Sequence, residues 1–134
     1  MLPSLWEHLN PGGQLVVQMP RNHDHPSHLL AKELAETEFA KFFPGDKKPA
    51  DRFSWMLPIE RYAEILFSLG GTDIVAFLKV YPHVLENSDA IVEWTKGTLL
   101  VPFMEQLPEN QKDLFLRRYK ELLRLRFPSS PVFY

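Results

Sequence analysis

The sequence predicts an α/β fold that is mostly helical, contains about two strands and is incomplete. Two stretches, 14–20 and 72–85, have strand composition, whereas apolar residues at helical spacing dominate the rest of the chain. The first stretch is apolar without alternation, as in a strand covered on both faces within a parallel sheet. Such a sheet needs more than two strands. The 134 residues therefore indicate part of one domain rather than a whole α/β domain.

The composition excludes several classes of protein. The chain has no cysteine, which rules out disulfides, thiolate catalysis and thiolate zinc sites and fits a reducing compartment. A formal net charge of -2 offers no basic surface for nucleic acid. No apolar run approaches the roughly 20 residues that cross a bilayer, and the N-terminus lacks signal-peptide features. We predict a soluble, cytoplasmic protein with no nucleic-acid or membrane partner.

The first part of the chain predicts a helix followed by a strand. Residues 3–10 have helical spacing, and Pro11 with the two glycines after it ends the helix. The strand at 14–20 is centred on the apolar residues 15–17 and closes at Pro20. Because these central residues do not alternate with polar ones, we expect the strand to be buried on both faces.

Helical spacing returns in the middle of the chain. Residues 27–43 predict a helix, and 44–52 form a polar loop rich in proline and lysine. Residues 58–70 predict the clearest helix, because Pro58 suits its first turn and Gly70 suits its end.

The last part of the chain predicts one strand and then helices. The strand at 72–85 is rich in β-branched and aromatic residues. Residues 87–108 predict one or two short helices with Ser88 as an N-cap, 109–127 predict the final helix, and 128–134 predict no regular element. The inward face of the final helix is predicted to contain Phe115, Tyr119, Leu122 and Leu123.

Three histidines follow the first predicted strand and leave three interpretations open. His23, His25 and His28 lie partly in a proline-containing loop, and no carboxylate–histidine helix motif accompanies them. They are compatible with a solvated loop, with the rim of a substrate pocket, or with a metal site. Tyr81 and His83 end the second predicted strand, where ligand-facing and purely structural roles are both open.

Several segments together resemble the trans-aconitate 2-methyltransferase family of class I S-adenosylmethionine-dependent methyltransferases. They are "LNPGGQLVVQMPRNHDHPSHLLAKELA", "IERYAEILFSLGG", "VYPHVL" and "IVEWTKGT". The most family-specific parts are "VQMPRN" followed by Pro26-Ser27-His28, then Tyr81-x-His83 and Glu93-Trp94, in which Trp94 is expected to be core. The resemblance covers nearly the whole chain.

The resemblance implies an incomplete class I methyltransferase (Rossmann-like) domain, with residues 1–134 as its C-terminal part. Family members carry the Gly-rich cofactor turn before the region that matches, and a final antiparallel strand after it. The complete enzyme would use S-adenosylmethionine, whereas this chain is expected to bind none and to be inactive alone. No catalytic residue, cofactor-binding residue or metal ligand is assigned to it.

The resemblance also implies a pocket for a small carboxylic acid. Neutral or cationic donors suit such a ligand. The residues assigned to substrate binding are Asn22, His28, Tyr81, His83 and Thr98. Val101 stands where the family pattern has an arginine, Arg21 where an acidic residue is common, and Pro82 where a second tyrosine is common. These departures leave the acceptor open.

Two other functions remain open from the sequence. Unpaired strands would favour self-association or a complementary chain, so the alternative is a non-catalytic, self-associating interaction module, for example a dimer. The histidines leave open a helical protein that binds a metal or a small acid.

Overall fold

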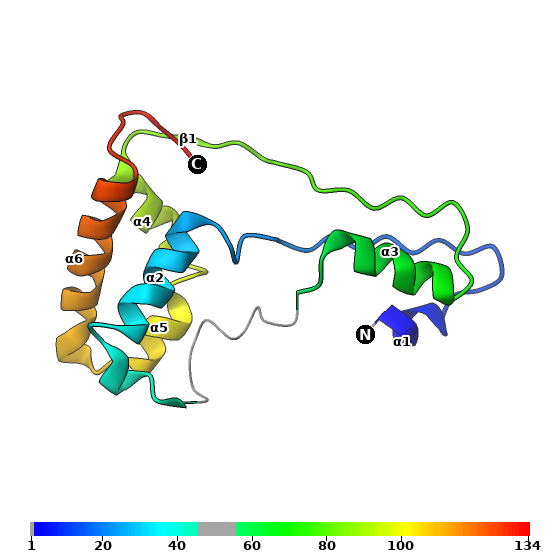
Figure 1. The fold of residues 1–134 in the computed structure, drawn as a ribbon, viewed down its shortest axis with the longest axis horizontal. Helices are drawn as coiled ribbons and strands as arrows, with labels where there is room; N and C mark the ends of the chain where they lie inside the picture. The colour runs from blue at the N-terminus through cyan, green and yellow to red at the C-terminus, as the bar shows by residue number, and fades with distance from the viewer. Residues whose placement is uncertain (1, 46–55) are drawn as a thin grey trace. The chain divides into compact units, whose positions relative to one another are not determined.

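The computed structural model describes residues 2–45 and 56–134, which form two compact units (Figure 1). Unit 1 contains residues 2–21 and 56–80, and unit 2 contains residues 22–45 and 81–134. The predicted loop at 44–52 lies mostly outside the described residues. The predicted predominance of helix is confirmed, because helices make up most of the regular structure and one two-stranded antiparallel sheet accompanies them.

Unit 1 contains two of the predicted helices. Helix α1 (Leu2–Trp6) is followed by a turn in which the Gly13 N–H donates to the Asn10 carbonyl at 2.8 Å. Gly12 has a φ of 78° in this turn, a conformation that glycine adopts without a steric penalty. Helix α1 ends at Trp6, so the predicted stop at Pro11 and the two glycines is wrong, and these residues form a separate turn further along the chain.

Helix α3 (Ile59–Ser68) ends in a Schellman motif. The Gly71 N–H donates to the Leu66 carbonyl and the Gly70 N–H to the Phe67 carbonyl, both at 3.0 Å. Gly70 has a φ of 88°, so a residue without a Cβ suits this position. A Cβ on Gly71 would lie 2.9 Å from the Leu66 carbonyl oxygen. The predicted helix and its glycine stop are confirmed.

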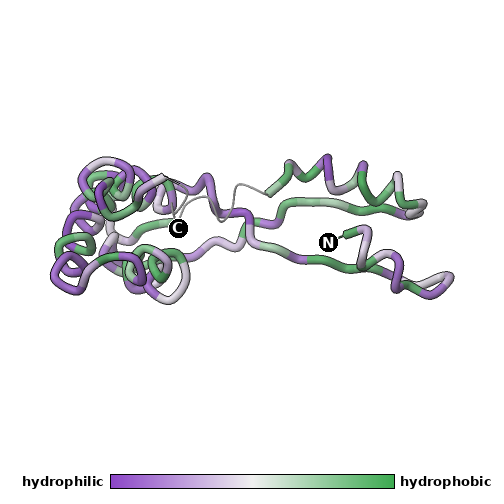
Figure 2. The backbone as a smooth tube through the Cα atoms, turned by 90° about the horizontal axis from the view of Figure 1, so that it is seen from below, coloured by the Kyte–Doolittle hydropathy of each residue, from purple (hydrophilic) through white to green (hydrophobic). Residues whose placement is uncertain are grey.

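The strand predicted at 14–20 is wrong as a buried strand, and of the strand predicted at 72–85 only Val84–Leu85, in unit 2, is paired in the described structure. Residues 14–20 and 72–80 are extended, but neither belongs to a sheet in the part of the chain that the structure describes. Val16 is 90% exposed and Val75 is 79% exposed. Figure 2 shows hydrophobic colouring along the extended stretches of unit 1. The stretches have strand composition without the neighbours that a ladder requires.

Unit 2 is a helical cluster. Its helices are α2 (Pro26–Glu36), the 3-10 helix η1 (Ala40–Phe42), α4 (Ser88–Lys96), α5 (Val101–Gln106) and α6 (Glu109–Arg126). The helix predicted over 27–43 therefore stops early, and a 3-10 turn completes it. The two short helices and the final helix are confirmed. The N-cap of α4 is Asn87, whose side chain accepts from the Ala90 N–H at 3.2 Å, and not the predicted Ser88.

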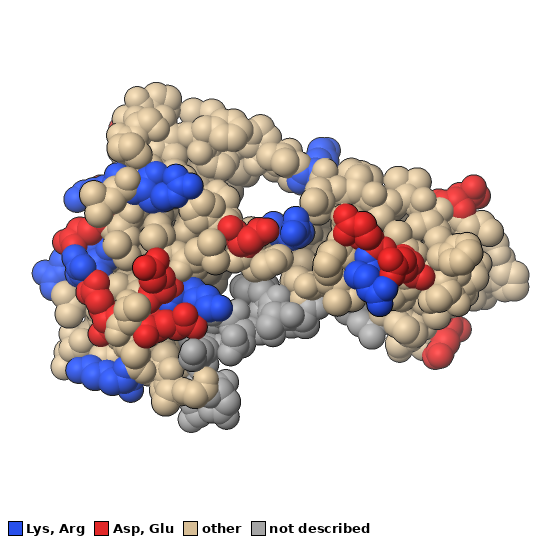
Figure 3. Space-filling view, viewed as in Figure 1, with Lys and Arg blue, Asp and Glu red and all other residues tan. Residues whose placement is uncertain are grey.

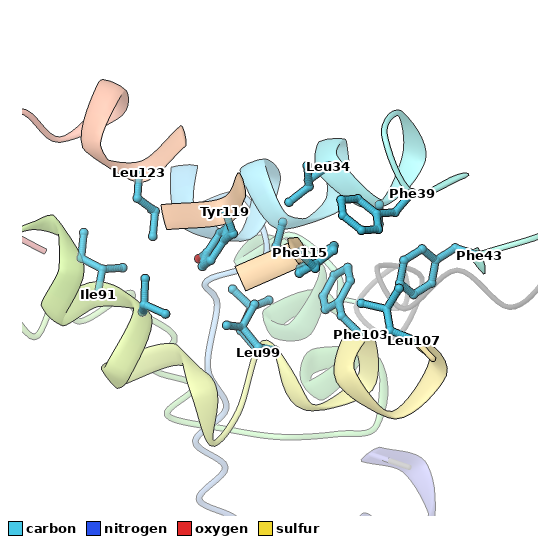
Figure 4. Packing of buried hydrophobic residues seen from close by; sticks show 14 of the residues in the cluster. Leu34, Phe39, Phe43, Ile91, Leu99, Phe103, Leu107, Phe115, Tyr119 and Leu123 are labelled. Atoms are coloured by element: carbon cyan, nitrogen blue, oxygen red, sulfur yellow. The ribbon is translucent and has the colours of Figure 1, made fainter. Parts of the chain in front are cut away.

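The core of unit 2 is aromatic at one end (Figure 4). Phe115 of α6 lies edge-on to Phe39, with ring centroids 5.0 Å apart, and 5.6 Å from Phe103 of α5. Phe43 adds a further edge-on contact with Phe103 at 5.9 Å. Three of the four residues predicted to face inward from α6 are buried, and Leu122 packs partly buried against them. Interlocked aromatic rings of this kind add to the stabilisation from burial alone.

The segment predicted to lack regular structure at the end of the sequence forms a strand. Strand β2 (Val132–Phe133) pairs antiparallel with β1 (Val84–Leu85). The pairing extends by one residue, because His83 and Tyr134 exchange two backbone hydrogen bonds of 2.8 Å. Val132 is buried in the core. The prediction at 128–134 is wrong because so short a strand leaves no periodic pattern in the sequence.

Ion pairs connect the helices of unit 2 at the surface, where acidic and basic side chains are interspersed (Figure 3). Asp89 of α4 accepts two hydrogen bonds from Arg124 of α6, at 2.9 and 2.8 Å. Glu38 accepts two from Arg118, at 2.8 and 2.7 Å. The helices of the described chain include none that is long and apolar enough to cross a membrane.

Candidate functional site

The candidate site is built around the first turn of α2, just after the polar stretch that contains the histidines. His25 is the N-cap of this helix, because its Nδ1 accepts the Ser27 N–H at 3.4 Å. Pro26 occupies the first helical position, where a missing N–H costs nothing. An imidazole thus takes the place of the serine or aspartate oxygen that more often caps a helix.

Ser27 lies at the centre of the site and is fully buried. Its hydroxyl oxygen is 2.9 Å from His25 Nδ1, 3.3 Å from His28 Nδ1 and 2.9 Å from the Tyr134 hydroxyl. The Ser27 carbonyl accepts a hydrogen bond of 3.1 Å from the buried Tyr119 hydroxyl of α6. Two tyrosines that are distant in the sequence therefore form hydrogen bonds with this one serine.

Aromatic rings surround His25. Its ring stacks on Phe127 with centroids 6.1 Å apart, and Tyr134 meets it edge-on at 4.7 Å. His28 lies 6.4 Å from His25 in an edge-on arrangement. We call His25, Ser27, His28, Tyr119 and Tyr134 the histidine–tyrosine cluster.

Burial keeps this cluster neutral. It is the main cause that lowers the pKa of His28 to about 4, and the nearby His25 and His23 lower it further against the opposing effect of Asp24. The pKa of His25 is also lowered, first by burial and then by Arg126. Burial raises the pKa of both Tyr119 and Tyr134. At neutral pH the cluster therefore contains uncharged rings and hydroxyls.

The predicted site residues all lie in unit 2 but differ in their surroundings. Asn22 is exposed in the turn before α2, where its carbonyl accepts the His25 N–H at 3.0 Å. His28 belongs to the cluster itself. His83 joins it through the backbone pairing with Tyr134. Asn22, His28 and His83 are thus associated with one region.

The other two predicted residues are exposed. Tyr81 is 55% exposed and precedes β1. Thr98 is exposed beyond the C-terminal end of α4. The ring of His83 contacts Trp94 of α4, with centroids 4.4 Å apart. Trp94 is 51% exposed, so its predicted place in the core is wrong, since its ring covers His83 at the surface.

Sequence reasoning missed the residues that organise the cluster. Ser27, Tyr119 and Tyr134 are not among the predicted site residues, although Tyr119 is predicted to face inward from the final helix. The signal available was the Pro26-Ser27-His28 motif together with two tyrosines in the last part of the chain. Nothing local pairs Ser27 with Tyr134, which lies 107 residues away.

Neither a metal cluster nor a cofactor cradle is found in the described ranges. Residues 2–45 and 56–134 contain no group of three or more histidine, aspartate or glutamate residues placed to hold a metal ion. The glycine pairs beginning at Gly12 and Gly70 follow α1 and α3, whereas a nucleotide-cradling turn leads from a strand into a helix. The described residues therefore include no glycine-rich turn that leads from a strand into a helix.

A groove in unit 2 lies along α4 and α6, apart from the predicted residues. Its lining carries both charges, with Glu93 and Lys96 on α4 and Asp113, Arg117 and Lys120 on α6. None of the five predicted substrate-binding residues lines it. Its mixed charge marks it as a solvated face rather than a selective anion site.

Comparison with known proteins connects the whole chain to one kind of enzyme. No family model matches the sequence. Trans-aconitate 2-methyltransferase from Deinococcus radiodurans is 44% identical over 137 aligned residues, which cover 100% of this chain and 52% of that protein. The proteins of the same name from Rhizobium meliloti and Sinorhizobium fredii are 43% and 38% identical and are covered over 46% and 49% of their lengths.

The chain spans about half the length of the curated relatives it matches. Identity at this level along the entire chain confirms the resemblance that the sequence motifs indicate. By sequence, this chain is a homologue of trans-aconitate 2-methyltransferase along its whole length, and its coverage is consistent with the C-terminal half of that enzyme.

Proposed function

We propose that this chain is the acceptor-binding part of an S-adenosylmethionine-dependent methyltransferase that acts on a small polycarboxylic acid such as trans-aconitate. The observation that carries the proposal is the 44% identity to a trans-aconitate 2-methyltransferase over all of this chain and half of that enzyme. The missing glycine cradle supports a division in which another polypeptide segment binds the cofactor. A non-catalytic module has no support among the relatives named above.

The chemistry of the acceptor suits the side chains that the chain offers. A carboxylic acid with a pKa near 4 is already ionised at neutral pH, so methylation of its oxygen needs no general base. The acceptor side has to orient the carboxylates and exclude water, which contributes up to roughly 7 to 11 kcal/mol when two reactants are held in line. The residues proposed to contact the acceptor are Asn22, His28, Tyr81, His83 and Thr98.

The partner that completes the enzyme is proposed to bind unit 1. Its extended segments 14–20 and 72–80 expose apolar side chains along their lengths, including Val16 and Val75. Paired strands would satisfy the backbone of these segments and cover their side chains. A complementary chain would supply them and complete the enzyme, whereas a second copy of this chain would cover the segments without adding a cofactor site.

The decisive experiment supplies the missing part. The chain is co-expressed with the region of the Deinococcus radiodurans relative that it does not match, and methylation of trans-aconitate is measured with S-adenosylmethionine. We expect activity from the pair and none from either part alone. A pair that associates but methylates no small polycarboxylic acid would refute the proposed acceptor. A pair that does not associate would refute the division into parts.

Two matched variants test the surface used for association. Val75→Asp places a charge on the second extended segment and should abolish association, as measured by light scattering of the mixture. Leu125→Asp makes the same kind of change at a residue of α6 with the same exposure, 80% against 79%. It should leave association unchanged. Equal effects of the two variants would argue against strand pairing in unit 1.

A further inference from the structure

One arrangement of protons satisfies all the hydrogen bonds at Ser27 Oγ and at the cap of α2. A serine hydroxyl has one proton to donate and two lone pairs that accept. Ser27 Oγ has three partners within hydrogen-bond distance, which are His25 Nδ1, His28 Nδ1 and the Tyr134 hydroxyl. One of them therefore accepts and the other two donate.

The cap of α2 decides which partner accepts. His25 Nδ1 receives the Ser27 backbone N–H, so this nitrogen has a lone pair and no proton. A lone pair facing Ser27 Oγ at 2.9 Å requires the serine proton between them. His25 is therefore neutral with its proton on Nε2.

The remaining two contacts follow from this assignment. Because the serine proton is used, the Tyr134 hydroxyl donates to Ser27 Oγ, and so does His28 Nδ1. We infer that Ser27 and Tyr134 are positioning residues that fix His28 as the Nδ1–H tautomer while His25 is fixed as the opposite one. The nitrogen that accepts is therefore Nδ1 in His25 and Nε2 in His28.

This tautomer determines what His28 offers to a substrate, a consequence that rests on the proposed function. With the proton on Nδ1, the other ring nitrogen, Nε2, is an acceptor. A neutral His28 therefore receives a hydrogen bond from a hydroxyl or an un-ionised acid, and it binds a carboxylate at Nε2 only after taking up a proton. Titratable and charged groups around the two rings are His23 and Asp24 before α2, Arg126 of α6 and Tyr134 after β2.

Nitrogen-15 NMR of the free chain tests the assignment, because protonated and unprotonated ring nitrogens differ strongly in chemical shift. At neutral pH we expect an unprotonated Nδ1 in His25 and a protonated Nδ1 in His28. Ser27→Ala should move His28 toward the Nε2–H form, and Tyr134→Phe should move it in the same direction by less. The same tautomer in both histidines of the wild-type chain would overturn the inference, whether or not either variant folds.

A control separates this positioning role from general stability. Tyr62→Phe removes a hydroxyl in unit 1 that, among the described residues, accepts an exposed backbone N–H from Leu57, and it should leave both histidine signals unchanged. The methylation assay of the completed enzyme distinguishes the two proposals. The two histidines could show opposite tautomers while the completed enzyme methylates no polycarboxylic acid. That result would support the tautomer assignment and reject only the proposed acceptor.

Discussion

The two units are built from the same kinds of residues but bury them to very different extents. In unit 2 a contiguous set of aliphatic and aromatic side chains is buried between α2, α4, α5 and α6. Among the described residues of unit 1, Leu2 is the one buried hydrophobic side chain. Val16, Phe67 and Val75 are exposed instead. Unit 2 is therefore stabilised from within, whereas unit 1 has apolar segments that nothing in the described chain covers.

This difference shows that hydrophobic pattern and burial are separate properties. Residues 15–17 have the apolar run typical of an internal strand, and Val16 is nevertheless exposed. An apolar run gains free energy only if another surface removes it from water. Unit 2 contains its own complementary surfaces, whereas the described part of unit 1 leaves its apolar segments exposed.

The largest expected effect contrasts the two units directly. Phe115→Ala removes a fully buried ring at the centre of the aromatic core and should lower the free energy of unfolding by about 3–5 kcal/mol. Val16→Ala in unit 1 should change it by less than about 0.5 kcal/mol. Denaturant unfolding followed by circular dichroism measures both. Comparable losses would mean that Val16 is buried in solution.

A pH titration sharpens the comparison through the histidine cluster. The pKa of His28 is about 4 in the folded chain and 6.5 without burial, so the unfolded chain binds more protons between these values. Stability should therefore be full above about pH 6.5 and fall toward pH 4, by about 1–2 kcal/mol because the ring is only partly buried. Unfolding experiments across this range should show a smaller fall in His28→Gln. An equal fall in the wild-type chain and in His28→Gln would mean that groups other than His28 cause the pH dependence.

A pair of tyrosine substitutions compares single hydroxyl groups in the two units. Tyr119→Phe removes the buried donor to the Ser27 carbonyl and should cost about 1 kcal/mol. Tyr62→Phe removes an exposed acceptor in unit 1 and should be nearly neutral. Thermal unfolding of the two variants provides the measurement. A loss in Tyr62→Phe as large as that in Tyr119→Phe would show that unit 1 is better ordered than its burial indicates.

The smallest expected effect concerns a helix end in unit 2. Asn87→Ala removes the side-chain oxygen that caps α4 and should lower stability by about 0.5–1 kcal/mol. Asn110→Ala, in the first turn of α6, removes no side-chain hydrogen bond of the described structure and should have little effect. The order of the two melting temperatures checks the assignment of Asn87 as the cap, and equal melting temperatures would contradict it.

Local rules predicted the helices well and the strands poorly. The stop of α3 at Gly70 and the helix that begins at Glu109 depend on neighbours within one or two turns, which the sequence displays. The extended segments at 14–20 and 72–80 have strand composition, but pairing depends on a partner that local sequence does not specify. For the same reason the short strand at Val132–Phe133 was not predicted.

The candidate site was predicted in part. His28 and His83 were chosen from motifs, and both lie at or next to the histidine–tyrosine cluster. Their roles in substrate binding stay a prediction. The buried hydroxyl of Ser27 was missed because a serine in a first helical turn is usually read as a solvated residue. Its burial depends on Tyr119 and Tyr134, which come from distant parts of the chain.

By itself, the sequence determined the helical content of this protein and its likeness to trans-aconitate 2-methyltransferase, since helix spacing, caps and motifs are properties of neighbouring residues. Only the tertiary structure decided which apolar segments are covered and which histidine nitrogens face Ser27. The physical reason is that burial and hydrogen bonding require two surfaces. For Ser27 and Tyr134 these surfaces lie 107 residues apart and meet only when unit 2 is folded.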